Sequence, residues 1–361
     1  MHRCFRGRNS PVNDTRRRYV PLVLVVLIFL TSASSQAAPR RVIIDTDPGI
    51  DDAMAILLAL NSPELKVEAL TVVAGNVEAP QGLENALKIV SLAERCDVAV
   101  AGGAQHPLNQ KLVTAQFWHG KNGLAGVELP PTKCKADRRF GPDLIIEMVH
   151  AYPHELTLIP VGPLTNIALA VSKDPSIVSL VRDIVIMGGS ISGGNVNGAA
   201  EANIYNDPEA AEIVFNAGWT VTMIGSDVGE RTLITRKHLA ELQASHGPES
   251  DFVGKLADFY LTRSEKSGYP GAAMYDPLAV GTVIDPTLVT LKDMHVDVET
   301  KGEFTRGETV ANRMGSNELN ILHGDHYEIE GTTELKPNAR VCLASDADRF
   351  VNLFITRIKG K

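Results

Sequence analysis

The sequence predicts an α/β fold with a mostly parallel central sheet covered by helices on both faces. Two observations carry this prediction. From Arg41 onward, short β-rich apolar runs alternate with longer amphipathic runs, which is typical of repeated βα units in a parallel sheet. The unusual polar residues follow several of the apolar runs, where open α/β sheets bind their ligands. No linker-like tract and no internal repeat interrupts the pattern, so residues 38–361 are predicted to form one domain.

The predicted elements follow one another along the chain. The strands expected from apolar, β-rich runs are Val42–Ile44, Val67–Val73, Val98–Ala101, Leu156–Pro160, Asp183–Met187, Thr220–Ile224 and His295–Glu299. The helices expected from amphipathic runs are Asp52–Leu60, Gln81–Arg95, Pro142–Ala151, Asn166–Val171, Pro208–Ala217 and Asp346–Ile358. Asp51 is available as the cap of the first helix, and Asp207 before Pro208 predicts another capped helix start.

The amino-terminal segment has the order of a signal peptide, predicted over residues 1–37. Met1–Arg18 is polar and basic, Tyr19–Leu30 is apolar, and Thr31–Ala38 is rich in small residues. The apolar run is shorter than the roughly 20 residues that span a bilayer. Thr15–Val20 also resembles the twin-arginine export motif, and the general route and a permanent anchor stay open as alternatives. We therefore expect export to the periplasm or medium, without stable membrane association after cleavage.

Charge and cysteine usage exclude some functions. The formal net charge of −8 and the lack of a basic stripe argue against nucleic acid as a partner. Cys4 would leave with the signal peptide, and the three widely spaced cysteines that remain form neither a disulfide framework nor a zinc motif. One bridge among Cys96, Cys134 and Cys342 stays open.

An acidic cluster follows the first predicted strand. Asp45, Asp47, Asp51 and Asp52 place four carboxylates within eight residues, and Pro48-Gly49 would turn the later pair back toward the first. Like charges at short range repel, and a hard cation such as calcium or magnesium relieves that repulsion. A solvated acidic helix start explains only one or two of these carboxylates. An aspartyl-phosphate phosphatase also begins with Asp-x-Asp after a strand, but it leaves the third and fourth acids unexplained.

With these residues in view, the sequence resembles the inosine–uridine-preferring nucleoside hydrolase family. The resemblance covers about Val42 to Pro277 and implies a Rossmann-like fold of the nucleoside hydrolase type. It is carried by residues 45–53 (DTDPGIDDA), Ala74-Gly75-Asn76, His119-Gly120 with Gly123-Leu124, residues 162–166 (GPLTN), Met187-Gly188-Gly189, Asn195, Glu201, Asn203, residues 206–211 (NDPEAA) and Asp276-Pro277-Leu278.

The resemblance implies a calcium site and a ribose site. Asp47 would bind Ca²⁺ and act as the catalytic base on water, while Asp52, Asp276 and the backbone carbonyl of Thr165 would complete the ligands. Asp45 would orient its neighbours rather than bind the ion. The residues implied for substrate binding are Asp51, Asn76, Glu201 and Asn203 at the ribose hydroxyls, Asn195 near the 5′ end, Met187 against the sugar, and His119 with Tyr275 at the base.

Several of these positions have structural alternatives. Asn76 could serve a turn, Thr165 could cap the helix from Asn166, and His119 could be an ordinary surface histidine. Two positions depart from the family. Tyr275 stands where many members carry a histidine that protonates the leaving base, and Ala202 stands where a phenylalanine often occurs. A tyrosine is a poor acid near pH 7, but it can stack on a base. This favours purines, although Tyr275 could instead donate a hydrogen bond to uracil.

The resemblance therefore implies calcium-dependent hydrolysis of ribonucleosides to ribose and free base, through an oxocarbenium-like transition state, by a homodimer or homotetramer. The alternative from another class is a calcium-dependent nucleoside-binding protein that has lost turnover. An intact Asp47 argues against that alternative.

Overall fold

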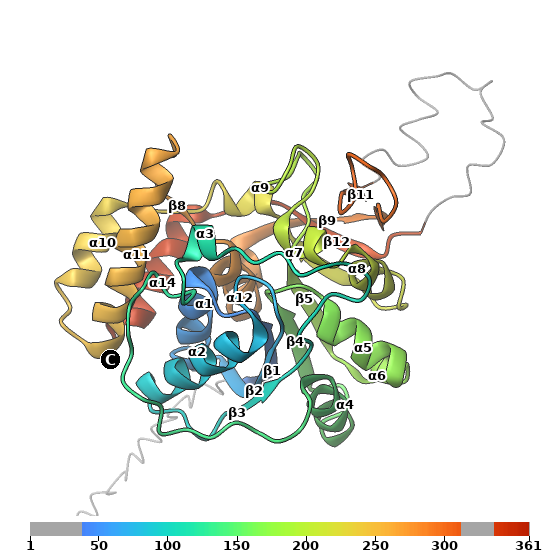
Figure 1. Cartoon of the computed structure of the whole chain (residues 1–361), viewed down its shortest axis with the longest axis horizontal. Helices are drawn as coiled ribbons and strands as arrows, with labels where there is room; N and C mark the ends of the chain where they lie inside the picture. Colours follow the sequence, from blue (N-terminus) through green and yellow to red (C-terminus); the bar gives the residue numbers. More distant parts are fainter. Residues whose placement is uncertain (1–37, 312–335, 361) are drawn as a thin grey trace, which may run out of the picture. The chain divides into compact units, whose positions relative to one another are not determined.

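An eight-stranded sheet forms the centre of the protein (Figure 1). The computed structural model describes residues 38–311 and 336–360, so the predicted signal peptide lies outside the described residues and its cleavage stays a prediction. The strands lie in the order β3-β2-β1-β4-β5-β6-β12-β9, and only β12 and β9 pair antiparallel. Their bounds are β1 (Arg40–Thr46), β2 (Leu65–Val72), β3 (Ala99–Gly102), β4 (Leu156–Pro160), β5 (Asp183–Met187), β6 (Val221–Ile224), β9 (Val289–Met294) and β12 (Ala339–Ser345). The predicted fold class is confirmed.

Helices cover both faces of this sheet, and each face has its own apolar core. Buried side chains such as Leu57, Phe252 and Phe350 belong to one core, and Leu144 and Val214 belong to the other. The first face is covered by α1 (Ile50–Leu60), α2 (Ala79–Leu92), α10 (Arg236–Gln243), α11 (Pro248–Lys266), α12 (Tyr275–Ile284) and α14 (Ala347–Lys359). The second is covered by α4 (Gly141–Ala151), α5 (Thr165–Lys173), α6 (Ile177–Leu180) and α8 (Pro208–Phe215). Burial on both faces explains why the central strands read as continuous apolar runs.

Two predicted helix starts are wrong, and one is confirmed. α1 begins at Ile50 with Gly49 as its N-cap, so Asp51 lies in the first turn and is not the cap. α5 begins at Thr165, so Thr165 does not cap it either; its hydroxyl instead donates to Asp207 Oδ2 at 2.7 Å. Asp207 caps α8 as predicted, because its side chain accepts from the backbone N–H of Ala210. In both wrong cases the helix extends further toward the preceding strand than the sequence pattern indicates.

A long segment between β3 and α4 crosses the same end of the molecule as the loop after β1 (Figure 1). It contains the short helix α3 (Gln116–His119). A disulfide joins Cys96, just after α2, to Cys134 in this segment, which resolves the pairing left open by the sequence. Cys342 is buried and is a free thiol.

The remaining elements are short. They are α7 (Ala202–Asn206), α9 (Ser226–Gly229), the 3₁₀ turn η1 (Pro286–Leu288), and two small antiparallel sheets made of β7 (Leu233–Ile234) with β8 (Ala272–Ala273) and of β10 (Val296–Val298) with β11 (Thr309–Ala311). Among the described residues, no helix combines the length and the apolar character that a membrane crossing requires.

The strand order reverses between β1 and β4, and such a reversal opens a crevice at the carboxyl ends of the strands. The candidate site is built there.

Candidate active site

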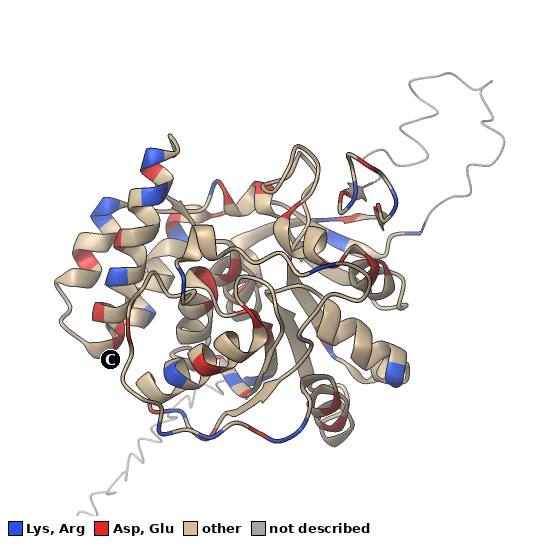
Figure 2. Ribbon diagram, viewed as in Figure 1, with Lys and Arg blue, Asp and Glu red and all other residues tan. Residues whose placement is uncertain are grey.

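Three buried carboxylates converge at the carboxyl end of the sheet. Asp51 and Asp52 lie in the first turn of α1, and Asp276 lies in the first turn of α12. One carboxylate oxygen from each lies within 4.8 Å of the others. In Figure 2 the acidic positions of α1 and α12 lie in the interior, whereas most basic positions lie on outer helices and loops. Such a group of buried like charges could hold a metal ion.

Asp52 also fixes the loop that joins β1 to α1. Its Oδ1 accepts hydrogen bonds from the hydroxyl of Thr46 at 2.6 Å and from the backbone N–H of Asp47 at 3.1 Å. Its Oδ2 accepts from the backbone N–H of Gly49 at 2.9 Å and from Asn76 Nδ2 at 3.0 Å. The predicted turn at Pro48-Gly49 therefore does bring the later acids back toward the first.

The carboxylate of Asp47 fits closely between two strand ends. Its Oδ2 accepts from the backbone N–H of Asn76 at 2.6 Å, whereas its Oδ1 is buried and lacks a hydrogen-bond partner in the described part of the chain. A Cβ on Gly75 would lie 2.0 Å from Oδ2, and one on Gly162 would lie 2.6 Å from Oδ1. Only glycine leaves room for the carboxylate at these two positions. Asp51 Oδ1 is likewise buried without a partner among the described residues.

Burial shifts the protonation of these acids. It raises the pKa of Asp47 well above its usual range, with repulsion from Asp52 as the next cause. The pKa of Asp51 rises to about 8 for the same two reasons. Burial, followed by repulsion from Asp51, raises the pKa of Asp276 well above the ordinary value. A bound cation reverses this effect because it favours the ionised carboxylates. The two unpartnered oxygens and the oxygen-only donor set fit a hard cation.

Asp45, expected to orient the metal ligands, and Thr165, expected to bind the ion through its carbonyl, differ in their surroundings. Asp45 Oδ1 accepts hydrogen bonds from Thr71 Oγ1 and Asn166 Nδ2, so this carboxylate ties β1 to β2 and α5. Burial raises its pKa to about 7. Thr165 is buried at the start of α5. The ligand role of its carbonyl stays a prediction.

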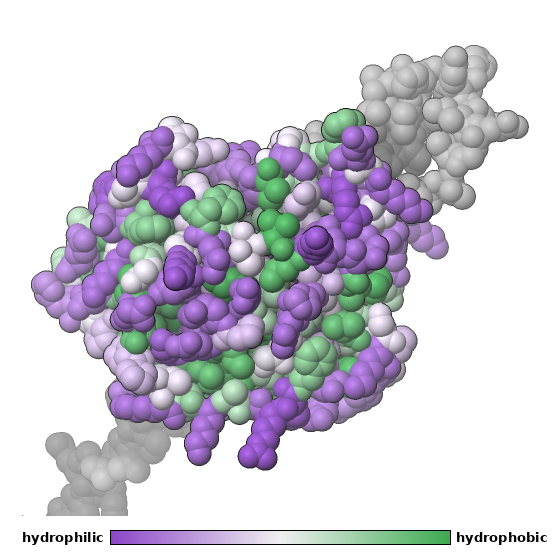
Figure 3. Space-filling view, in the orientation of Figure 1, coloured by the Kyte–Doolittle hydropathy of each residue, from purple (hydrophilic) through white to green (hydrophobic). Residues whose placement is uncertain are grey.

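A cavity of about 610 Å³ opens beside the acidic group. Asp276 lines it, and so do all eight residues predicted for substrate binding. These eight are Asp51, Asn76, His119, Met187, Asn195, Glu201, Asn203 and Tyr275. These residues come from segments far apart in the sequence that meet at one end of the sheet. Their individual contacts with a substrate stay predictions. Apolar side chains that are exposed also line the cavity, among them Phe117, Val113 and Val196. On the face shown in Figure 3, hydrophobic residues lie exposed among hydrophilic ones.

Glu201 and Asn203 are two polar residues of the cavity lining that are fixed by hydrogen bonds. Glu201 caps α7, and its carboxylate accepts from the backbone N–H groups of Gly189 at 2.9 Å and Asn203 at 2.9 Å. Asn203 Nδ2 donates to the carbonyls of Val161 at 2.8 Å and Met187 at 3.1 Å. These bonds join the loops after β4 and β5. They also leave Asn203 Oδ1 as the acceptor of this side chain that a ligand hydroxyl can use.

The lining also contains a histidine and several aromatic side chains. His119 Nδ1 accepts from the backbone N–H of Ile50 at 3.2 Å, and burial lowers the pKa of His119 to about 4. The imidazole is therefore neutral, with its proton on Nε2. The rings of Trp118 and Tyr260 meet edge to face with centroids 6.1 Å apart. Burial raises the pKa of Tyr275 above its ordinary value, so its hydroxyl stays protonated.

Sequence reasoning missed several residues that line this cavity, among them Glu230, Tyr260 and Ser264. Tyr260 and Ser264 lie four positions apart on one face of α11. That spacing could have shown that they share a face, but no signal in the sequence directs this face toward the acidic cluster. Glu230 follows α9, and burial raises its pKa.

The chain is similar to several known proteins. Residues 42–352 match the model of the family described as inosine-uridine preferring nucleoside hydrolase. The pyrimidine-specific ribonucleoside hydrolase RihA of Salmonella arizonae is 39% identical over 320 residues, covering 88% of this chain and 98% of that protein. The RihA protein of Escherichia coli O9:H4 gives the same identity and coverage.

Two solved structures are similar over nearly the whole chain. The plant nucleoside hydrolase PpNRh1 is 37% identical with a TM-score of 0.81, covering 90% of this chain and all of that one. The purine-preferring ribonucleoside hydrolase from Gardnerella vaginalis is 37% identical with a TM-score of 0.80, covering 89% and 98% of the two chains.

Proposed function

Because the chain belongs to the inosine-uridine preferring nucleoside hydrolase family and is thus a nucleosidase-type enzyme that hydrolyses ribonucleosides, we propose that its activity depends on calcium and passes through an oxocarbenium-like transition state. Two observations together carry the proposal. The carboxylates of Asp51, Asp52 and Asp276 converge. One oxygen of Asp51 and one of the neighbouring Asp47 are buried without a hydrogen-bond partner among the described residues. A hard cation with oxygen ligands satisfies both oxygens and relieves the repulsion.

In the proposed mechanism, the metal site activates water and the polar residues of the cavity bind the ribose. A bound calcium ion would supply a Lewis acid that lowers the pKa of water. The carboxylate of Asp47, beside the ion, is expected to act as the base that accepts the proton of the attacking water. Asp51, Glu201 and Asn203 bind the ribose hydroxyls. The negative charges of Asp51 and Glu201 stabilise the positive charge that grows on the sugar ring more than they stabilise the ground state.

The experiment that tests the proposal uses mature protein with inosine, adenosine, uridine and cytidine, resolving the free bases chromatographically. We expect release of base and ribose, loss of activity by about 100-fold or more on chelation, and better recovery with calcium than with magnesium. Equal recovery with either ion would contradict the choice of metal. Nucleoside binding without ribose release would indicate a binding protein, and orthophosphate release from a phosphomonoester with magnesium would indicate a phosphatase. Export and a homo-oligomeric state belong to the same proposal; cell fractionation and light scattering test them.

We further propose a preference for purines, supported by the aromatic side chains around the cavity. Trp118, Tyr260, Tyr269 and Tyr275 all line it. A purine presents a larger face for stacking and offers N7 for protonation, which reduces the need for a dedicated acid. The relatives differ in base preference, because the RihA proteins are pyrimidine-specific and the Gardnerella enzyme prefers purines.

Substitution of Tyr275 tests the purine preference. Tyr275→Phe should keep most of the kcat/KM for inosine, and Tyr275→Ala should lose about tenfold or more, because alanine removes the stacked ring whereas phenylalanine keeps it. The measurement is kcat/KM for inosine and uridine in the wild type and both variants. Tyr152→Ala, outside the cavity, is the matched control. If uridine is the better substrate and Tyr275→Phe lowers kcat/KM as much as Tyr275→Ala, the hydroxyl of Tyr275 and not its ring supports activity. The purine preference is then wrong.

A further inference from the structure

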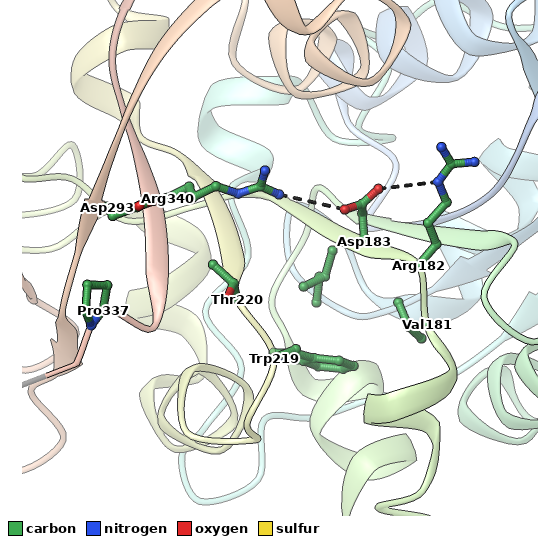
Figure 4. A pocket seen from close by; sticks show the side chains of 9 residues that line it. Val181, Arg182, Asp183, Trp219, Thr220, Asp293, Pro337 and Arg340 are labelled. Atoms are coloured by element: carbon green, nitrogen blue, oxygen red, sulfur yellow. Dashed lines mark ion pairs between the residues drawn. The ribbon is translucent and has the colours of Figure 1, made fainter.

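A second cavity lies at the amino ends of the strands, opposite the carboxyl ends where the candidate active site lies (Figure 4). It has a volume of about 520 Å³ and lies near the amino ends of β5, β6 and β12. Asp183 and Arg182 line it from the start of β5, and Arg340 lines it from β12. In Figure 4 the carboxylate of Asp183 lies between the two guanidinium groups. None of these residues belongs to the site described above.

Three arginines share the single carboxylate of Asp183. The nearest nitrogens of Arg40, Arg182 and Arg340 lie 3.6, 3.7 and 3.7 Å from its oxygens. These distances exceed the roughly 2.7–2.9 Å of a charge-assisted hydrogen bond. Within the described residues, none of the three guanidinium groups donates a hydrogen bond of ordinary geometry to the protein. Arg340 Nε is in addition buried without a partner in that part of the chain.

Other arginines of this protein are paired far better. Arg236 donates to Glu265 at 2.9 and 2.8 Å and also contacts Asp258. Arg139 donates to Asp137 at 3.0 Å and to Glu147 at 2.8 Å. The arginines at the second cavity differ from these two, whose guanidinium groups each make several hydrogen bonds to carboxylates.

The charge around this cavity is unbalanced. Arg182 and Arg340 line the cavity beside Asp183, and Arg40, which is not part of the lining, contacts the same carboxylate. Asp293, exposed on the wall formed by β9, makes no ion pair with any of the three within the described residues. Burial, followed by repulsion from Arg182, lowers the pKa of Arg40. The arrangement is the converse of the acidic cluster. Three guanidinium groups with unused hydrogen-bond donors surround Asp183, whose single carboxylate does not neutralise them.

We propose that this cavity binds an oxyanion of the phosphate class. A tetrahedral dianion matches the planar fork of a guanidinium group and can accept from several donors at once. The hydroxyl of Thr220 lies on the same wall and offers a further donor. The ring of Trp219 is fixed by its hydrogen bond to the carbonyl of Val214 at 2.8 Å, so the cavity has a rigid side. The anion could be inorganic phosphate or the phosphate group of a nucleotide, and the binding is independent of nucleoside turnover.

Isothermal titration with inorganic phosphate tests this proposal, using the metal-loaded enzyme without excess divalent ion and chloride at matched ionic strength. We expect one saturable site for phosphate and none for chloride. Arg182→Gln and Arg340→Gln should each weaken phosphate binding by about tenfold or more, because each removes a charged donor. Arg139→Gln, which makes the same change at a fully paired arginine, should leave the affinity unchanged.

Uridine 5′-monophosphate separates the two sources of the anion. If the nucleotide binds more tightly than phosphate, and Arg340→Gln removes that advantage, the site takes the phosphate of a nucleotide; equal affinities identify inorganic phosphate. In buffer with chloride and no phosphate, Arg340→Gln should keep the melting temperature of the wild type, because the substitution relieves repulsion between Arg340 and the other two arginines. No saturable phosphate binding, or binding that survives both arginine substitutions, overturns the proposal. Because turnover is not measured in this titration, its outcome is separate from that of the proposed function.

Discussion

Replacing Asp47 by alanine should lower kcat for nucleoside hydrolysis by about 10³-fold or more and weaken calcium binding. A general base alone contributes about 10²–10⁴-fold, and this carboxylate is also expected to bind the ion. The unpartnered Oδ1 of Asp47 has no evident structural task, whereas Oδ2 holds the backbone of Asn76. The measurements are kcat for inosine and the dissociation constant for calcium by titration calorimetry.

Two further variants separate chemistry from folding. Asp47→Asn keeps an oxygen that can accept from Asn76, so it should preserve the melting temperature and still lose turnover. Asp285→Asn makes the same change at a turn that lies outside the cavity, and it should behave as the wild type. Near-native activity of Asp47→Ala would refute the assignment of both base and ligand.

The second large effect is expected for 2′-deoxyribonucleosides, whose kcat/KM should be about 10⁴-fold below that of the ribonucleosides. A site built to bind a hydroxyl rejects the analogue without it by 10⁴–10⁵-fold, because buried polar groups are left unpaired. Glu201 is buried at one side of the cavity, and Asn203 keeps Oδ1 for a ligand. The measurement is kcat/KM for inosine and 2′-deoxyinosine.

The matched comparison uses the predicted 5′ end. Glu201→Gln should shrink the discrimination against the deoxy substrate, and Asn195→Ala should leave it unchanged, because Asn195 is expected near the 5′ hydroxyl. Melting temperatures of both variants separate a loss of the α7 cap from a loss of binding. Comparable kcat/KM values for ribose and deoxyribose substrates in the wild type would contradict the ribose site.

Local features of the fold and the site could be predicted from the sequence, whereas features set by tertiary packing could not. The alternation of strands and helices is local, because strands buried on both faces must be apolar. The acidic cluster is also local, since Asp45 to Asp52 are neighbours in the chain. The first residue of α1 and of α5 depends instead on how the chain leaves the preceding strand, so the cap assignments of Asp51 and Thr165 were wrong.

The same distinction explains the residues that were missed. Tyr260 and Ser264 look like ordinary residues of an amphipathic helix, and only the packing of α11 turns them toward the cavity. Cys96 and Cys134 lie 38 positions apart, and their Cα atoms meet at 5.0 Å only because the segment after β3 folds back. Pairings of that kind require the arrangement of the elements, which no local pattern supplies.

That bridge also bears on how the protein is made. Trp118 and His119, which form part of the cavity wall, lie inside the covalent ring closed by Cys96 and Cys134. Disulfides form in oxidising compartments and are rare in a reducing cytoplasm. For a ring of this size, the chain-entropy model gives about 4 kcal/mol of stabilisation by limiting the unfolded chain. Enzyme recovered from a reducing host would lack this restraint on the wall, so the oxidation state of each preparation becomes a variable in every measurement of base preference.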